Sequence, residues 1–186
     1  MILHLVRHGQ TDLHTQGIMA GWKNDPGLNA EGRRQAQVTA LRLADQSRQA
    51  SIGAIYASPF PRAQQTAEII NTVLKVPLIF EDSLKDINIG DWNGQSVEQV
   101  FHSEIGQRYM ADPVGVRLPN GEEITEVEAR VIPVVERIRR AHRDAAVIVS
   151  HLDVIELILA HYKGGSLHDL HRGPAIPTGA LQTLEV

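Results

Sequence analysis

The sequence predicts an α/β fold with a mostly parallel sheet that helices cover on both faces. Three apolar, β-branched runs are typical of buried strands: Ile2–Val6, Ile52–Ala57 and Ala146–Val149. Helical patterns lie between them, and strands that alternate with helices favour parallel pairing. The 186 residues are enough for one well-buried domain and too few for two, so we expect a single domain over residues 1–186.

The first half of the chain begins with strand Ile2–Val6 and continues with a helix from Asn29 to about Gln49. Asn29 is the predicted N-cap, because its short side chain can accept a hydrogen bond from the first helical turn. Strand Ile52–Ala57, a helix over Arg62–Leu74 and a strand over Val76–Phe80 follow. The inward side of the first helix is expected to consist of Ala36, Ala40, Leu41 and Leu43.

The second half adds helices and strands in the same alternating order. Pro133 is expected to bend or disrupt its helix, since proline removes a backbone donor. The Gly- and Pro-containing segments Ala111–Glu123 and Lys163–Thr178 are predicted to be surface excursions of the same domain. The expected helices are Val97–Met110, Ile124–Ala141 and Asp153–Tyr162, and the expected strands are Ala146–Val149 and Ala180–Val186.

Composition narrows the class of protein. There are no cysteines, which removes disulfides, thiol catalysis and thiolate metal sites, and fits a reducing cytoplasm. A net charge of -4 argues against nucleic acid as a partner, because duplex binding usually needs a basic surface. We expect no signal peptide and no membrane association, since no apolar run approaches the roughly 20 residues that cross a bilayer.

Three cationic or polar groups follow three of the predicted strands. Arg7, His8 and Gly9 come after the first strand, Ser58 leads to Arg62 after the second, and His151 follows the strand at Ala146–Val149. Ligands of open α/β sheets bind outside the carboxyl ends of the strands. Each segment alone is more often a solvated strand end, but their recurrence at one sheet edge favours a site that binds and processes an anion.

These residue types suit phosphate chemistry. Two guanidinium groups can donate paired hydrogen bonds to a dianion. Arg7 and Arg62 would also disfavour the imidazolium form of His8 and keep that ring nucleophilic, and Gly9 would let the backbone approach a bound group closely. His8 could then attack a phosphoryl group in line, while His151 stabilises the developing charge.

The ordered segments LVRHGQTD, ASPFPRAQQTAEI and VIVSH resemble the histidine phosphatase superfamily, in the branch of cofactor-dependent phosphoglycerate mutases and related small phosphatases. The segments DPGLNAEGRRQA, LKDINIGDWNGQS and PNGEE extend the resemblance over nearly the whole chain. The resemblance implies a three-layer α/β/α sandwich with a mostly parallel sheet. It also implies a phosphohistidine intermediate, with no metal and no cofactor.

Matched to the motifs of the family, His8 corresponds to the nucleophile, Arg7 and Arg62 to the phosphate clamps, and His151 to the second active-site histidine. Asp86 falls where the family usually has a glutamate that donates a proton to the leaving group. Aspartate is about one methylene shorter, so its backbone must lie closer to the substrate or a water must relay the proton.

Two further positions depart from the family. His14 stands where an asparagine is common, and Leu152 stands where the residue after the second histidine is often glycine. His14 can still donate one hydrogen bond to phosphate, and so can the backbone of Leu152, whose side chain either turns into the core or narrows the pocket. With Gly9 and with Thr11, which is expected to fix the loop, these residues complete the predicted phosphate-binding set.

The leading functional hypothesis is a cytoplasmic phosphomonoesterase that acts on a small phosphorylated metabolite. The short chain and the compact segment SLKDINIGDWNG favour hydrolysis over mutase-type transfer, which stays an alternative. A domain that binds phosphorylated ligands without turning them over is the second alternative. The substrate stays undetermined, with specificity expected from the loops 17–28 and 111–123; the oligomeric state stays open, with a homodimer as one alternative.

Other polar residues have weaker functional interpretations. His161, His168 and His171 could suggest a metal, although their spacing is irregular. Trp22 is either a wall of the substrate entrance or a loop anchor. Four acidic residues could act near the site but are more typical of a solvated acidic face or a helix start: Glu81, Asp82, Glu122 and Glu123.

Overall fold

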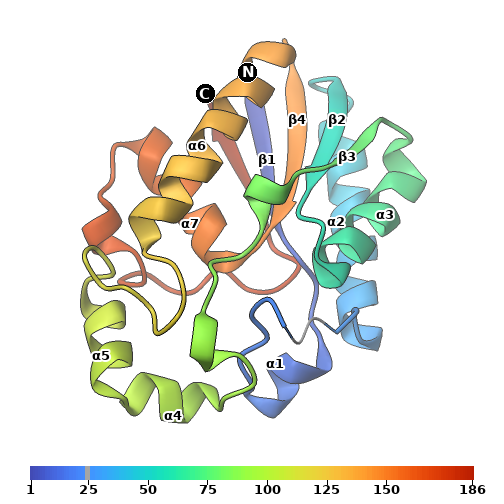
Figure 1. Ribbon diagram of the computed structural model, residues 1–186. Helices are drawn as coiled ribbons and strands as arrows, with labels where there is room; N and C mark the ends of the chain where they lie inside the picture. Colours follow the sequence, from blue (N-terminus) through green and yellow to red (C-terminus); the bar gives the residue numbers. More distant parts are fainter. Residues whose placement is uncertain (24–25) are drawn as a thin grey trace.

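The computed structural model describes residues 1–23 and 26–186, and its centre is a five-stranded sheet in the order β3-β2-β4-β1-β5 (Figure 1). β1, β2, β3 and β4 are parallel, whereas β5 pairs with β1 in the antiparallel direction. The predicted mostly parallel sheet is therefore confirmed. The strands are β1 (Ile2–Arg7), β2 (Ile52–Ala57), β3 (Leu78–Phe80), β4 (Ala145–Ser150) and β5 (Leu181–Glu185).

Helices cover both faces of the sheet and complete three layers. Figure 1 shows α2 and α3 together on one side, α6 and α7 on the other, and α4 and α5 beyond the carboxyl ends of the strands. The helices are α1 (Asp12–Gln16), α2 (Ala30–Gln46), α3 (Pro61–Leu74), α4 (Val97–His102), α5 (Glu104–Ala111), α6 (Ile124–Ala141) and α7 (Leu152–Lys163). Short 3₁₀ turns occupy Asp82–Leu84, Gly90–Trp92 and Leu167–Asp169.

The alternation of side chains along the strands divides the core into two parts. Leu3 and Leu5 of β1 pack with the buried side chains of α6 and α7, while Val6 packs with those of α2 and α3. Successive strand residues point to opposite faces, so one strand contributes to both parts. Burial on both faces explains why the central strands read as continuous apolar runs.

Most predicted elements are confirmed, and the cap of α2 is formed as expected. The Asn29 side chain accepts a hydrogen bond from Gly32 N at 2.9 Å. The predicted inward position of Leu41 is wrong, because this side chain is 64% exposed, whereas Ala36, Ala40 and Leu43 are buried. The three buried residues have the i, i+4, i+7 spacing of one helix face, and Leu41 falls outside that spacing.

Three local differences follow from capping and packing. The helix predicted over Val97–Met110 divides at Ser103, whose extended backbone ends α4 and whose Oγ accepts from Gly106 N at 3.1 Å to start α5. α6 continues through Pro133, since buried side chains on both sides of the proline hold it against the core. The short helix α1, which starts at the Thr11 N-cap, was not predicted.

The sheet brings the three strand ends together. Arg7 pairs in register with Ser150, and Ala57 pairs with Val149. His8 N donates to Ser150 O at 3.0 Å, and Ser58 N donates to Val149 O at 3.0 Å. The residues that follow β1, β2 and β4 therefore share one edge.

No helix within residues 1–23 and 26–186 combines the length and apolarity that spanning a membrane requires.

Candidate active site

A cavity of about 360 Å³ opens at the carboxyl ends of the strands. Arg7, His8, His14, Arg62 and Asp86 contribute its polar wall near the sheet. The remaining wall is largely apolar and includes Leu13, Ile18, Met19, Ile87, Ile89, Trp92, Val97, Phe101, Met110, Leu118 and Leu152. The space exceeds what one phosphate group fills, so it also holds the rest of a substrate.

His8 is buried, and the backbone fixes its tautomer. His8 is 3% exposed, and Nδ1 of its ring lies 2.8 Å from the carbonyl oxygen of Gly9. A carbonyl oxygen only accepts, so Nδ1 carries the proton and Nε2 of the neutral ring keeps a free electron pair. Burial lowers the pKa of His8 well below its ordinary value, and the charge of Arg62 lowers this pKa further. The ring is thus neutral and nucleophilic at Nε2.

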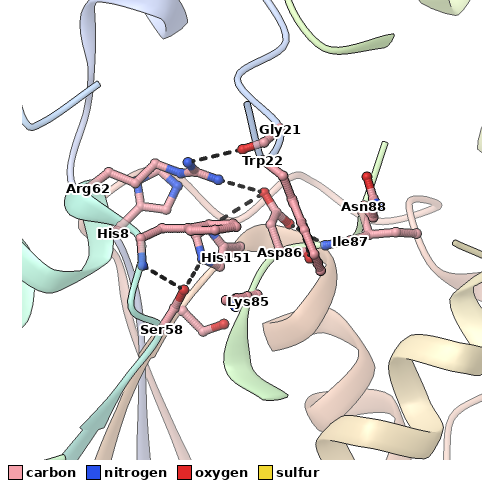
Figure 2. Close-up of polar contacts among 12 residues, drawn as sticks. His8, Gly21, Trp22, Ser58, Arg62, Lys85, Asp86, Ile87, Asn88 and His151 are labelled. Carbon is pink, nitrogen blue, oxygen red and sulfur yellow. Dashed lines mark hydrogen bonds and ion pairs between the residues drawn. The ribbon is translucent and has the colours of Figure 1, made fainter. Parts of the chain in front are cut away.

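Arg62 and Arg7 supply the cationic surroundings of His8. Arg62 is 1% exposed; its guanidinium lies 5.0 Å from the centre of the Phe60 ring and 3.2 Å from Asp86 Oδ2 (Figure 2). Arg7 donates from one terminal nitrogen to the carbonyl oxygen of Ile176, and its buried Nε has no hydrogen-bond partner among the described residues. Both side chains are held in place before any anion binds, which limits the entropy cost of binding.

Asp86 reaches the site because its loop is fixed close to the sheet. Its backbone carbonyl accepts from Trp22 Nε1 at 2.8 Å and from Arg130 at 2.9 Å, and Ser150 Oγ donates to the neighbouring Leu84 O at 2.8 Å. These contacts bring the backbone near enough for the shorter aspartate. Burial raises the pKa of Asp86, although the charges of Arg62 and Arg7 act in the opposite direction.

His151 lies behind His8, with the two ring centres 5.1 Å apart. Its Nε2 is 2.8 Å from Ser58 Oγ, and its buried Nδ1 lies 3.5 Å from Asp86 Oδ2 without a hydrogen bond within the described residues (Figure 2). Burial lowers the pKa of His151 well below its ordinary value, and Arg62 adds to this effect. The ring is neutral and has one nitrogen that a ligand could engage.

His14 is oriented by Thr11, which starts α1. The backbone N–H of Thr11 donates to His14 Nδ1 at 3.3 Å, and Thr11 Oγ1 lies 2.8 Å from the same nitrogen. Since Nδ1 accepts, the proton of the neutral ring is on Nε2. The rings of His14 and His8 have centres 5.4 Å apart, and His14 lines the cavity. His14 thus offers the single donor that the sequence suggests in place of an asparagine.

The other two predicted phosphate-binding residues have different surroundings. Gly9 does not belong to the cavity wall; its N–H donates to Thr66 Oγ1 at 3.0 Å, and a Cβ atom there would lie 2.4 Å from Gly32 O. This glycine therefore permits the close approach of β1 and α2. The sequence left two alternatives for the Leu152 side chain, turning into the core or narrowing the pocket. In the structure it packs against the core and also lines the cavity.

The weaker sequence interpretations are mostly structural. Trp22 acts as a loop anchor through its bond to Asp86 O, and it is absent from the cavity wall. Residues 17–21 of the predicted specificity loop line the cavity, while its positions 24–25 lie outside the described residues. None of the four acidic residues lines the cavity: Glu81 pairs with Arg137, Asp82 with Lys85, Glu122 with Arg130 and Glu123 with Arg117.

The three histidines near the C-terminus do not converge. His161 lies 3.8 Å from Glu128, and His168 lies 2.9 Å from Asp112. His171 instead reaches the cavity. Among the described residues, no three His, Asp or Glu side chains are grouped so that they could hold a metal ion.

Four ionisable cavity residues were not predicted as part of the site: Tyr109, Asp153, Glu156 and His171. Asp153 and Glu156 are three apart in α7, directly after His151, and this spacing places both on one face of the helix. That spacing was a detectable signal. Tyr109 and His171 carried none, because they come from a divided helix and an irregular loop.

Together, the sheet edge and the cavity define an enzyme-like site of an α/β protein, with a neutral histidine beside two buried arginines. A family model for the histidine phosphatase superfamily (branch 1) matches residues 3–186. The chain therefore belongs to the histidine phosphatase superfamily, as its motifs predict.

Three similar proteins illustrate this membership. The uncharacterized phosphatase PhoE of Bacillus subtilis is 36% identical over 162 residues, which are 87% of this chain and 77% of that protein. Phosphoserine phosphatase 1 of Hydrogenobacter thermophilus is 32% identical over 152 residues, which are 80% of this chain and 70% of that protein. The solved structure of YhfR from Bacillus stearothermophilus matches with a TM-score of 0.87 at 28% identity and covers 100% of this chain and 91% of that one. These phosphatase relatives support the predicted class, a hydrolase of phosphate monoesters.

The pKa of His14 gives a test of its environment. Burial, with smaller contributions from Arg7 and Arg62, lowers this pKa from 6.5 to about 4. Between these values the unfolded chain binds a proton that the folded protein does not, so the free energy of unfolding falls as the pH falls. His14→Asn removes this contribution, which is at most about 1.4 kcal/mol per pH unit.

Urea unfolding of the wild type and of His14→Asn across this pH range checks the prediction. The exposed His102 supplies the control variant His102→Asn, which should keep the wild-type pH dependence. An identical pH dependence in the wild type and in His14→Asn would show that His14 is not held neutral.

Proposed function

We propose that this protein hydrolyses the phosphate monoester of a small metabolite through a phosphohistidine formed on His8. The observation that carries the proposal is the geometry of His8: its Nδ1 is committed to the Gly9 carbonyl, and its free Nε2 lies in a cavity with two buried arginines. The arginines can bind a phosphate dianion, and a histidine that stays neutral beside them can attack it.

The first chemical step transfers the phosphoryl group to the protein. His8 Nε2 attacks phosphorus, the N–P bond forms, and the bond to the leaving oxygen breaks. Arg7 and Arg62 hold the equatorial oxygens, and the Nε2–H of His14 and the ring of His151 donate to the same group. Phosphorylation places positive charge on the His8 ring, and the Gly9 carbonyl stabilises that charge through Nδ1–H.

Asp86 supplies the proton for this step. Its carboxylate pairs with Arg62, and an arriving phosphate competes for that guanidinium. The bound dianion adds negative charge beside Asp86 and raises the pKa of its carboxyl beyond the effect of burial. The protonated carboxyl donates to the leaving oxygen, and the resulting carboxylate later accepts a proton from the water that attacks the phosphohistidine.

We place this reaction in the cytoplasm as part of the proposal. The absence of cysteine from the sequence fits a reducing compartment.

Replacement of His8 tests the nucleophile. His8→Ala should lower kcat for p-nitrophenyl phosphate by at least about 10³-fold, because the covalent route is lost. Rapid quenching of wild-type turnover at alkaline pH should trap a phosphorylated His8, identified by mass spectrometry. His102→Ala, which alters an exposed histidine of α4, serves as the control and should keep wild-type turnover.

Three outcomes of this experiment would contradict the proposal. Turnover that survives in His8→Ala, or a wild-type protein that binds phosphate esters without turnover, would exclude the covalent mechanism. A phosphohistidine that transfers to 3-phosphoglycerate faster than to water would identify a mutase instead.

Replacement of Asp86 tests the proton donor. Asp86→Asn should lower kcat/KM for an alkyl phosphate by about 10²–10⁴-fold, because an alkoxide needs a proton to depart. The loss should be at least about tenfold smaller for p-nitrophenyl phosphate, whose leaving group departs as an anion. In the wild type, kcat/KM for the alkyl ester should fall as the pH rises through the pKa of Asp86, and the variant should lack that decrease. Equal losses for both esters, or a wild-type rate that rises steadily into alkaline pH, would remove Asp86 from this role.

A further inference from the structure

The cavity continues past the reacting groups to a second set of polar side chains. Asp153 and Glu156 of α7 line this part together with His171, and we call these three residues the acidic subsite. Their side chains are 19%, 14% and 6% exposed. Asp153 is in the first turn of α7, two positions after His151, so the subsite begins beside the position of the phosphate.

His171 lies between the two carboxylates. Its Nε2 is 3.3 Å from Asp153 Oδ1 and its Nδ1 is 3.2 Å from Glu156 Oε2, while Tyr109 donates to Asp153 Oδ1 at 3.4 Å. Burial disfavours the imidazolium, but the close contact with Glu156 and the charges of both carboxylates outweigh it and raise the pKa of His171. The acidic subsite thus contains two carboxyl groups and one cation.

Two atoms of the acidic subsite have unused hydrogen-bonding capacity. His171 Nε2 and Glu156 Oε2 are buried, and their contacts within the described part of the chain are ion pairs rather than hydrogen bonds. Buried polar atoms are normally satisfied, and exceptions point to a missing partner. Nε2 of a protonated His171 is a donor and faces Asp153, whereas the Glu156 oxygen is an acceptor, and a cationic donor in the cavity can provide its partner.

The charges of the site leave one negative charge without a counter-ion. Arg7 and Arg62 balance the two negative charges of a bound phosphate dianion, and Asp86 is neutral when it acts as an acid. Asp153 and Glu156 then exceed the single charge of His171 by one. Burial raises the pKa of Asp153 to about 6, with Asp86 and Glu156 also raising it against the opposing charges of His171 and Arg7. Once a bound phosphate engages Arg7, the excess negative charge above this pH is present at a cost.

We propose that the leaving group of the substrate carries a positively charged amine that the acidic subsite binds, so that phosphorylated amino alcohols are the preferred substrate class. This proposal rests on the proposed function, in that the phosphate occupies the cavity beside His8. The ammonium group donates to Glu156 and Asp153 and supplies the missing counter-charge. A carboxylate on the leaving group, as in 3-phosphoglycerate, would add to the excess negative charge.

Binding of a matched pair of phosphonates tests the amine subsite without turnover. 2-Aminoethylphosphonate and 2-hydroxyethylphosphonate are similar in size and differ in an ammonium against a hydroxyl group, and neither has an ester bond. Calorimetric titration above the pKa of Asp153 should give the wild type at least about tenfold tighter binding of the amine, the effect of a hydrogen bond to a charged group. Equal affinities, or a preference for the hydroxyl compound, would overturn the proposal.

Variants then assign the preference to the acidic subsite. Asp153→Asn and Glu156→Gln, made singly, should each reduce the amine preference toward equal affinity while retaining the affinity for 2-hydroxyethylphosphonate. Glu98→Gln is the matched control, because it removes the same charge from an exposed position of α4 and should keep the full preference. An undiminished preference in both subsite variants would overturn the assignment.

Turnover separates this inference from the proposed function. A protein that prefers the amine but never hydrolyses p-nitrophenyl phosphate would contradict the phosphatase mechanism and support the amine subsite. A protein that hydrolyses p-nitrophenyl phosphate through His8 but binds the two phosphonates equally would overturn the amine subsite alone.

Discussion

The Nδ1–H group of His8 donates a hydrogen bond to the Gly9 carbonyl oxygen, and the chemistry of the site depends on this contact. It leaves Nε2 as the nucleophilic nitrogen of a ring that burial and Arg62 keep neutral. The close approach of Gly9 to Gly32 fixes the backbone that supplies this carbonyl, since no side chain fits between them. Packing of the loop after β1 against α2 therefore fixes the tautomer of the candidate nucleophile.

Contacts from distant parts of the chain hold the Asp86 loop close enough to the site for an aspartate to act as the acid. The Asp86 loop is held through Trp22, Arg130 and Ser150, three residues that do not line the cavity. α7 contributes both to the phosphate end and to the acidic subsite, because it begins immediately after His151. One cavity thus joins a cationic end for phosphate to an acidic end for the leaving group.

Sequence reasoning predicted the sheet edge well because its signals are local. Apolar strands that end just before His8 and His151, and shortly before Arg62, place these side chains together once the strands are parallel. It failed where tertiary contacts decide: the loop over residues 163–178, predicted to be a surface excursion, brings Ile176 to Arg7 and His171 to the cavity. Periodicity and composition carry no information on such contacts.

The central claim, that His8 is a neutral Nε2 nucleophile in the unliganded protein, can be measured directly. Nitrogen-15 NMR of protein labelled in its histidine rings reports the protonation of each ring nitrogen, and His8→Gln identifies the His8 signals. We predict a protonated Nδ1 and an unprotonated Nε2 that persist when the pH falls below the ordinary histidine pKa of 6.5. A His8 imidazolium just below pH 6.5, or a proton on Nε2 of the neutral ring, would contradict the account.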